Sequence, residues 1–200
     1  MKNKTIVTPK GIAQYPNLRS TETYNGQDTG KYSVQLKLTE SETDKLTDYL
    51  AHEWDVIKGT GEYATKRYAK GSVPNLGTKE TTEGTVFKFK TTASIKTKSG
   101  DVLKKTVPIY DAKCNVINGE IGAGSTIKVA CQIAPYYVSA SNYGLTLYLT
   151  GVQVIEYVAP GEVGSASALG FAVEDGYEVG NDEESTGMLN PVADDMIEDF

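Results

Sequence analysis

The sequence predicts a mainly β domain, a small closed or half-open β-barrel with one amphipathic helix, followed by an acidic tail. Several stretches alternate apolar and polar residues with period two, and one stretch has a helical period. Gly-rich turn signals separate the alternating stretches, as in small barrels. From residue 158 onward neither period survives. We therefore expect a domain over residues 1–157 and a disordered acidic tail over residues 158–200.

The first clear elements along the chain are a strand and a helix. Residues 31–38, KYSVQLKL, alternate and place Tyr32 on the apolar face. Thr39 and Glu42 then form a capping box, in which each side chain accepts a backbone N–H at the helix start. The apolar stripe that follows is Leu46, Leu50, Trp54 and Ile57. Its spacing predicts an amphipathic helix over about residues 40–57.

The later elements are strands. Residues 84–98, GTVFKFKTTASIKTK, predict one long strand with Phe87, Phe89 and Ile95 toward the core. Residues 126–133 predict a strand with Cys131 on its buried side. Residues 145–154 predict another, and the odd step in its apolar pattern at Gly151 is typical of a β-bulge.

The charge is divided sharply between the domain and the tail. All 20 Lys and Arg lie at or before Lys128, while residues 1–157 hold 15 of the 26 Asp and Glu, giving a net charge of +5. Residues 158–200 hold the other 11 acidic residues and no cation. The whole-chain charge of −6 therefore describes neither part. Such asymmetry suits a basic binding domain with an acidic interaction tail or, equally on charge alone, an ordinary domain with a solubilising tail.

The motifs of enzymes and metal sites are missing from the sequence. His52 is the one histidine and lies on the predicted helix, so catalytic sets with Ser or Cys would all depend on it. The glycines of residues 119–125 lack the Lys-Ser or Lys-Thr of a phosphate loop. Cys114 and Cys131 fit no metal spacing and are interpreted as free thiols in a reducing compartment. We expect no catalysis, cofactor, metal or membrane span.

Cations interleaved with aromatic residues are the strongest functional signal. Residues 58–128 hold 13 Lys and Arg against six Asp and Glu. Proteins that bind single strands without sequence preference combine cations for phosphates with aromatic faces for bases. The candidate contacts before the long strand are Tyr63, Lys66, Arg67, Tyr68 and Lys70. The candidate stripe on the strand's polar face is Lys88, Lys90, Lys96 and Lys98, which a solvated sheet face would also explain.

Four later tyrosines are further candidates for base contacts. Tyr148 is opposite Leu147 and Leu149, which predicts that it is exposed or on the binding side. The others lie near the connection between residues 133 and 144, where a hairpin can overhang a groove: Tyr136, Tyr137 and Tyr143. For each of these three tyrosines, packing within the protein and contact with a base are equally consistent with the sequence.

The second half of the chain resembles a known family. The matching segments are IKV at residues 127–129, YY at 136–137, NYGLTLYL at 142–149, VQVI at 152–155, PIYDA at 108–112 and the acidic end. These resemble the single-stranded DNA-binding proteins of tailed phages, an OB-fold group related to the gene 2.5 protein of T-odd coliphages. The opening GIAQYP at residues 11–16 matches more loosely. The helix at 40–57 departs from the simplest five-strand barrel of this kind.

The resemblance implies a non-enzymatic role in phage DNA replication, recombination and repair, in the cytoplasm of the bacterial host. It also implies that the tail competes with DNA for the domain and contacts replication proteins such as a polymerase, helicase-primase or recombinase. The tail residues expected to bind these partners are Asp194, Asp195, Glu198, Asp199 and Phe200. Whether the protein forms a homodimer is left open.

Two other functions stay open at this point. An RNA-binding module of the cold-shock type would use the same kind of surface, since OB folds bind both nucleic acids. A virion structural or assembly protein would use the tail only as a spacer. The sequence does not give the length of strand that is covered or the cooperativity of binding.

Overall fold

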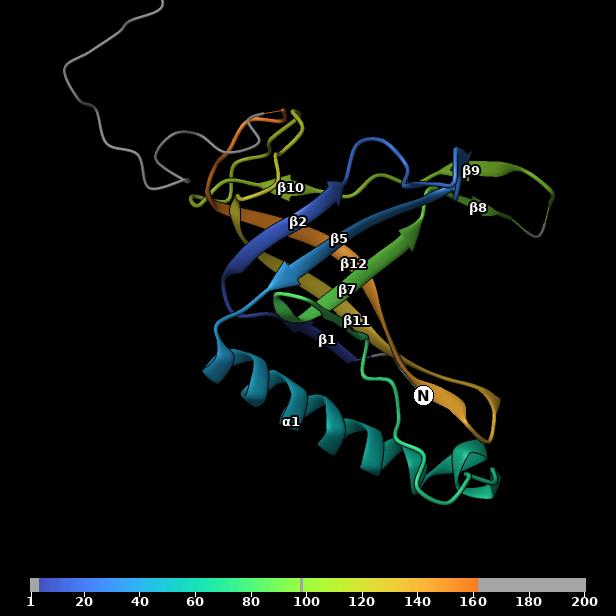
Figure 1. The fold of residues 1–200 in the computed structure, drawn as a ribbon. Coiled ribbons are helices and arrows are strands. Elements are labelled where there is room, and N and C mark those ends of the chain that lie inside the picture. The colour runs from blue at the N-terminus through green and yellow to red at the C-terminus, as the bar shows by residue number, and fades with distance from the viewer. Residues whose placement is uncertain (1–3, 98, 162–200) are drawn as a thin grey trace, which may run out of the picture.

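Five strands of the computed structural model, which describes residues 4–97 and 99–161, close into a ring (Figure 1). They are β2 (Gly11–Asn17), β5 (Lys31–Lys37), β7 (Gly84–Thr92), β11 (Thr126–Ser139) and β12 (Asn142–Glu156). Neighbours around the ring are antiparallel except β7 and β12, which run parallel, and the pairing of β11 with β12 completes the circle. This confirms a mainly β, OB-fold-like architecture with one helix.

Shorter elements extend the ring or stand beside it. β1 (Lys4–Val7) pairs with β11, β6 (Thr78–Thr81) with β7, and β10 (Ile109–Tyr110) with β12. Two small hairpins form separate sheets. One pairs β3 (Thr23–Tyr24) with β4 (Gln27–Asp28), and the other pairs β8 (Ser94–Lys96) with β9 (Val102–Lys104).

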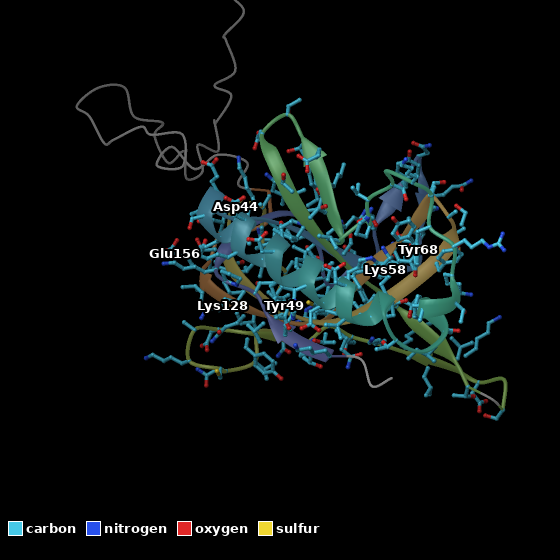
Figure 2. The ribbon with its side chains drawn as sticks, turned by 90° about the horizontal axis from the view of Figure 1, so that it is seen from below. Asp44, Tyr49, Lys58, Tyr68, Lys128 and Glu156 are labelled. Atoms are coloured by element: carbon cyan, nitrogen blue, oxygen red, sulfur yellow. The ribbon has the colours of Figure 1, made fainter. Side chains whose placement is uncertain are left out.

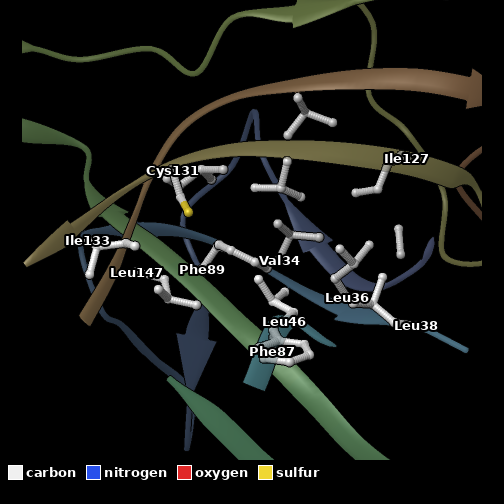
Figure 3. Packing of buried hydrophobic residues seen from close by; sticks show 14 of the residues in the cluster. Val34, Leu36, Leu38, Leu46, Phe87, Phe89, Ile127, Cys131, Ile133 and Leu147 are labelled. Atoms are coloured by element: carbon white, nitrogen blue, oxygen red, sulfur yellow. The ribbon is translucent and has the colours of Figure 1, made fainter. Parts of the chain in front are cut away.

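The core fills the inside of the ring with the inward-facing set of each strand (Figure 3). Phe87 and Phe89 of β7 are fully buried together with Val34 and Leu36 of β5. Cys131 of β11 is also fully buried, and burial raises the pKa of its thiol to about 12. The thiol is therefore neutral at physiological pH, which confirms its expected core position.

Helix α1 (Glu40–Lys58) confirms the predicted helix and lies across one end of the ring (Figure 1). Thr39 Oγ1 accepts from Glu42 N at 3.4 Å and donates to Glu42 Oε2 at 2.9 Å. The buried side chains of the helix are Leu46, Leu50 and Trp54. The short 3-10 helix η1 (Gly61–Thr65) follows it.

The single strand predicted over residues 84–98 is wrong. Ala93 leaves the ladder of β7, since its N–H donates to the carbonyl of Gly30 and its own carbonyl accepts from Lys105 N. Residues 94–96 then belong to the separate β8–β9 hairpin, where Ile95 is 51% exposed rather than in the core. The predicted bulge near Gly151 is confirmed, because Ala130 pairs with Gly151 while Cys131 pairs with Leu149. Of the tail expected over residues 158–200, only residues 158–161 are described, and Val158 is hydrogen-bonded to Ser125 and Gly122; the rest lies outside the described part of the chain.

Candidate nucleic-acid interface

The outward face of β7 carries two of the predicted cations. Because side chains alternate along a strand, burying Phe87 and Phe89 turns Lys88 and Lys90 to the outside of the ring, where both are half-buried. Tyr148 of β12 stands beside Lys90 in the parallel register. Tyr148 is 42% exposed, which confirms its expected outward direction.

The two lysines line a surface hollow of about 300 Å³, here called the first hollow, and Tyr148 lies outside its lining. Lys88 and Lys90 line it from β7, Thr146 from β12, Tyr136 from β11 and Lys79 from β6. Tyr136 is half-buried, and burial raises the pKa of its phenol, so the hydroxyl stays protonated at physiological pH. The first hollow therefore combines three cations with an aromatic ring.

A second hollow of about 620 Å³ adjoins the first, since Lys79 lines both. Gln14 and Tyr15 of β2 and Gln35 of β5 form one side of it. Glu80 of β6 and Glu83 of the turn between β6 and β7 also line it. The outer face of the ring thus carries a basic first hollow next to a second hollow that is lined by amides, an aromatic ring and carboxylates.

Lys88 is held by an internal carboxylate. Glu22, in the connection between β2 and β5, lies 2.9 Å from Lys88 Nζ, and both side chains are largely shielded from solvent. Within residues 4–97 and 99–161, no carboxylate lies within 4.0 Å of the ammonium groups of Lys79 or Lys90. Those two cations are open to an anionic ligand.

The aromatic cluster around Trp54 takes up four tyrosines that the sequence placed among the base contacts. Tyr143 is 3% exposed and stacks on Trp54 at 5.4 Å. Tyr63 and Tyr68 pack edge-on against Trp54, with their ring centres 6.2 and 6.1 Å from the centre of the Trp54 ring. Tyr137 packs on the edge of Tyr68 at 5.8 Å and is stacked with Tyr143 at 6.4 Å.

Hydrogen bonds of the same phenols tie three segments together. Tyr63 donates to the carbonyl of Pro135, Tyr137 to that of Arg67 and Tyr143 to that of Ser72. Rings that pack on one another in this way have their faces covered. Tyr63, Tyr68 and Tyr143 therefore fix the β11–β12 hairpin against the chain after α1.

The predicted cations of residues 66–70 lie outside the two hollows. Lys66, Arg67 and Lys70 are exposed, and Lys66 Nζ lies 5.3 Å from the centre of the Tyr137 ring. Lys58 caps Tyr68 in the same manner at 4.8 Å, and Figure 2 shows the two side by side near the end of α1. Consecutive residues of a strand face opposite ways, so Lys66, which lies over Tyr137, is on the side of the hairpin away from Tyr136.

Lys96 does not continue the stripe of Lys88 and Lys90. It is exposed on the separate β8–β9 hairpin, because the chain leaves β7 at Ala93. Lys98 is outside the described part of the chain.

Three side chains at the hollows were missed by the sequence reasoning. Lys79 sits in a strand of four residues, too short for a convincing period. Glu22 lies in a turn-rich connection, and only the fold brings it to Lys88. Tyr15 precedes Pro16 inside an alternating run, and a proline in a strand is a signal of irregular backbone that could have drawn attention to it.

The described residues contain neither a metal-ligand cluster nor a membrane-spanning helix. Over residues 4–97 and 99–161, no group of three or more His, Cys, Asp or Glu side chains is arranged to hold a metal ion. None of the helices described is long and apolar enough to span a bilayer.

Comparison with known proteins shows a shared fold. No protein-family model and no curated protein matches the chain. Among solved structures, gp2.5, a single-stranded DNA-binding protein encoded by bacteriophage T7, aligns with a TM-score of 0.59 and 20% identity, over 89% of this chain and 100% of that one. The single-stranded DNA-binding protein of bacteriophage Enc34, in complex with single-stranded DNA, aligns with a TM-score of 0.54 and 13% identity, over 78% and 89%.

Proposed function

We propose that this chain is a sequence-independent single-stranded DNA-binding protein that holds the strand along the first hollow. The observation that carries the proposal is the meeting of Lys79, Lys88 and Lys90 with the Tyr136 ring on the outer face of an OB-fold-like ring. Cations that follow phosphates and rings that stack on bases are what such binding needs. The fold shared with two phage single-stranded DNA-binding proteins supports it.

The contacts fall into two groups under this proposal. Lys88, Lys90, Tyr136 and Tyr148 contact the strand in and beside the first hollow. Phosphates farther along the strand meet exposed cations that lie outside the two hollows, namely Lys66, Arg67, Lys70 and Lys96. Tyr63, Tyr68, Tyr137 and Tyr143 position the β11–β12 hairpin without touching bases.

The tail is proposed to regulate this site and to recruit partners. Residues 158–200 form a segment of 43 residues with 11 carboxylates. A flexible chain of that length spans roughly 35–40 Å, enough to return to a groove on its own domain. Tethering gives an effective concentration on the millimolar scale, so the carboxylates compete with phosphates for the cations. DNA then frees Asp194, Asp195, Glu198, Asp199 and Phe200 to meet replication proteins in phage replication, recombination and repair.

Binding of labelled oligonucleotides to the full chain tests the core of the proposal. Fluorescence anisotropy with oligo-dT, duplex DNA and oligo-U of equal length should rank oligo-dT first by a wide margin over the duplex. The double variant Lys88→Ala/Lys90→Ala should bind more weakly. A plot of the logarithm of its association constant against the logarithm of the salt concentration should have a slope less steep by roughly 1.4, because each phosphate contact with a single strand contributes about 0.7.

The matched control is Lys10→Ala/Lys45→Ala, which removes the same charge from exposed positions outside both hollows and should leave binding unchanged. Preference for oligo-U over oligo-dT would instead assign the site to RNA. Absence of binding to every oligonucleotide would contradict the proposal and favour a structural role in the virion.

A further inference from the structure

Tyr15 of β2 adopts a backbone conformation that its side chain disfavours. Its φ is +48°, in the left-handed region that residues other than Gly rarely enter, and it precedes Pro16. A residue before proline is normally held in extended conformation, so the two preferences oppose the observed geometry. The ring is nevertheless 70% exposed and forms no part of the core.

A β-bulge produces this conformation. Gln14 pairs with Gln35, but the next pair is Asn17 with Ser33, so β2 carries one residue more than β5 at this point. Asn17 Nδ2 donates to the carbonyl of Tyr15 at 3.1 Å and fixes the bulge. By simple alternation after the buried Gly11 and Ala13, Tyr15 would point into the core. The bulge turns a large aromatic ring from the core to the outer surface.

The ring reaches the surface beside the second hollow, next to the amides of Gln14 and Gln35. Gln35 is 8% exposed, and its Oε1 is a buried acceptor that has no hydrogen-bond partner among the described residues. Such an orphaned acceptor is costly unless a ligand or solvent donor reaches it. Gln35 Oε1 is covered as it stands, but the residue lines the second hollow, and a turn of its amide brings the acceptor to the hollow. An aromatic face and such an acceptor are together complementary to a nucleobase, which has a π-face and at least one N–H donor.

The charges of the second hollow select a base over a phosphate. Glu80 and Glu83 line it; Glu83 is paired with Lys37 at 3.0 Å, but Glu80 has no cation within 4.0 Å among the described residues and disfavours an anion, whereas the adjoining first hollow holds Lys88 and Lys90. Lys79 lines both and stands at their junction. A strand with its phosphates on the first hollow can therefore turn a base into the second.

We propose that the second hollow is a nucleobase subsite, in which Tyr15 stacks on a base and Gln35 accepts a hydrogen bond from its edge. The subsite rests on the proposed function and deepens it. Every common base offers an amino or imino donor, so the contact tolerates any sequence. The strained bulge at Tyr15 is maintained for binding and not for folding.

Full-length Tyr15→Gly separates these roles because Gly accepts a positive φ at no steric cost. It should melt at a temperature no lower than the wild type. Affinity for a labelled oligo-dT of about 16 nucleotides, the upper site size of one OB fold, should nonetheless fall by roughly 5- to 150-fold, the loss of one base stack. An abasic oligonucleotide of equal length should bind both proteins alike. Tyr15→Phe, which keeps the ring, should bind oligo-dT as the wild type does.

Tyr157→Ala is the matched control, since Tyr157 is 57% exposed and lines neither hollow. Gln35→Met removes the acceptor at similar volume and should weaken oligo-dT binding without lowering the melting temperature. The subsite is refuted if Tyr15→Gly binds oligo-dT as tightly as the wild type, or weakens equally on the abasic strand. A lower melting temperature of Tyr15→Gly would contradict the strain argument, and unchanged binding by Gln35→Met would remove the hydrogen bond. A wild type that binds no oligonucleotide is a different result, because it overturns the proposed function itself.

Discussion

Glu22 is paired with Lys88, where we propose that a phosphate binds. The two side chains pair at 2.9 Å, and Lys88 lines the first hollow, where the proposal puts the DNA backbone. An anion that binds there must displace the carboxylate or share the cation with it. The pair therefore lowers the affinity of the free protein for anions, and it does so without involving the tail.

Glu22→Gln should tighten binding of oligo-dT several-fold at low salt. Without the carboxylate, a phosphate reaches Lys88 without displacing Glu22, and the gain in affinity over the wild type should shrink as salt rises because screening weakens the competing ion pair. Anisotropy titrations across a series of salt concentrations measure both quantities. Glu53→Gln makes the same charge change at an ion pair with Lys4, which lines neither hollow, and should leave binding unaltered. Weaker binding by Glu22→Gln would mean that Glu22 positions Lys88 for DNA.

At the scale of elements, the β11–β12 hairpin is held in place by the chain that follows η1. Asn75 bridges to Gly144 at the start of β12, where Asn75 N donates to the carbonyl of Tyr143 and its carbonyl accepts from Leu145 N. Ala69 N donates to the carbonyl of Ala140 at the hairpin tip. This docking sets the position of Tyr136, and hence the wall of the first hollow.

Gly144→Ala should undo that docking. A Cβ on Gly144 would lie 2.0 Å from Asn75 O, and its φ of +146° also disfavours a side chain. The backbone of residues 74–76 must move, which should lower the free energy of unfolding by at least about 1–3 kcal/mol in urea denaturation. Gly119→Ala is the control, because a Cβ there meets no described atom within 4 Å. Equal stability of the two variants would show that the contact at Asn75 is dispensable.

The sequence predicted those elements whose signals are local. Helix α1 follows from the capping pair Thr39 and Glu42 and from the apolar stripe, both within one segment. The bulge near Gly151 follows from a step in the apolar pattern of one strand. In each case the local preference and the tertiary fold agree, which is the situation in which pattern reasoning succeeds.

Features made by distant segments were beyond such reasoning. The aromatic cluster joins two regions of the chain, one with Tyr63 and Tyr68 and the other with Tyr137 and Tyr143. The hydrogen bonds between these regions link residues about 70 positions apart, and only the fold brings the rings to Trp54. The break at Ala93 depends on Gly30, which competes for its backbone N–H. The alternating pattern predicted that β7 extends to residue 98. The hydrogen bonds that end the strand are tertiary, and they cannot be recognised in the local sequence.

At the scale of the whole molecule, the proposed site and the tail carry opposite charges. Residues 1–157 have a net charge of +5 and residues 158–200 a net charge of −11. The described part of the tail stays on the domain, since Val158 N donates to Ser125 Oγ at 3.0 Å and its carbonyl accepts from Gly122 N at 2.8 Å. A truncation that keeps residues 1–161 preserves these contacts while removing all 11 carboxylates of the tail.

Deletion of residues 162–200 should tighten binding of oligo-dT at low salt, because the competing carboxylates are gone. The gain in affinity over the full chain should shrink as salt rises, because screening weakens the electrostatic contacts between the tail and the domain. Equal affinity of the two proteins at low salt would contradict competition. Deletion of Phe200 alone leaves every tail carboxylate side chain in place: if it tightens binding in part, the ring adds an aromatic anchor to the charge, whereas an unchanged affinity assigns the competition to the carboxylates and leaves Phe200 for a protein partner.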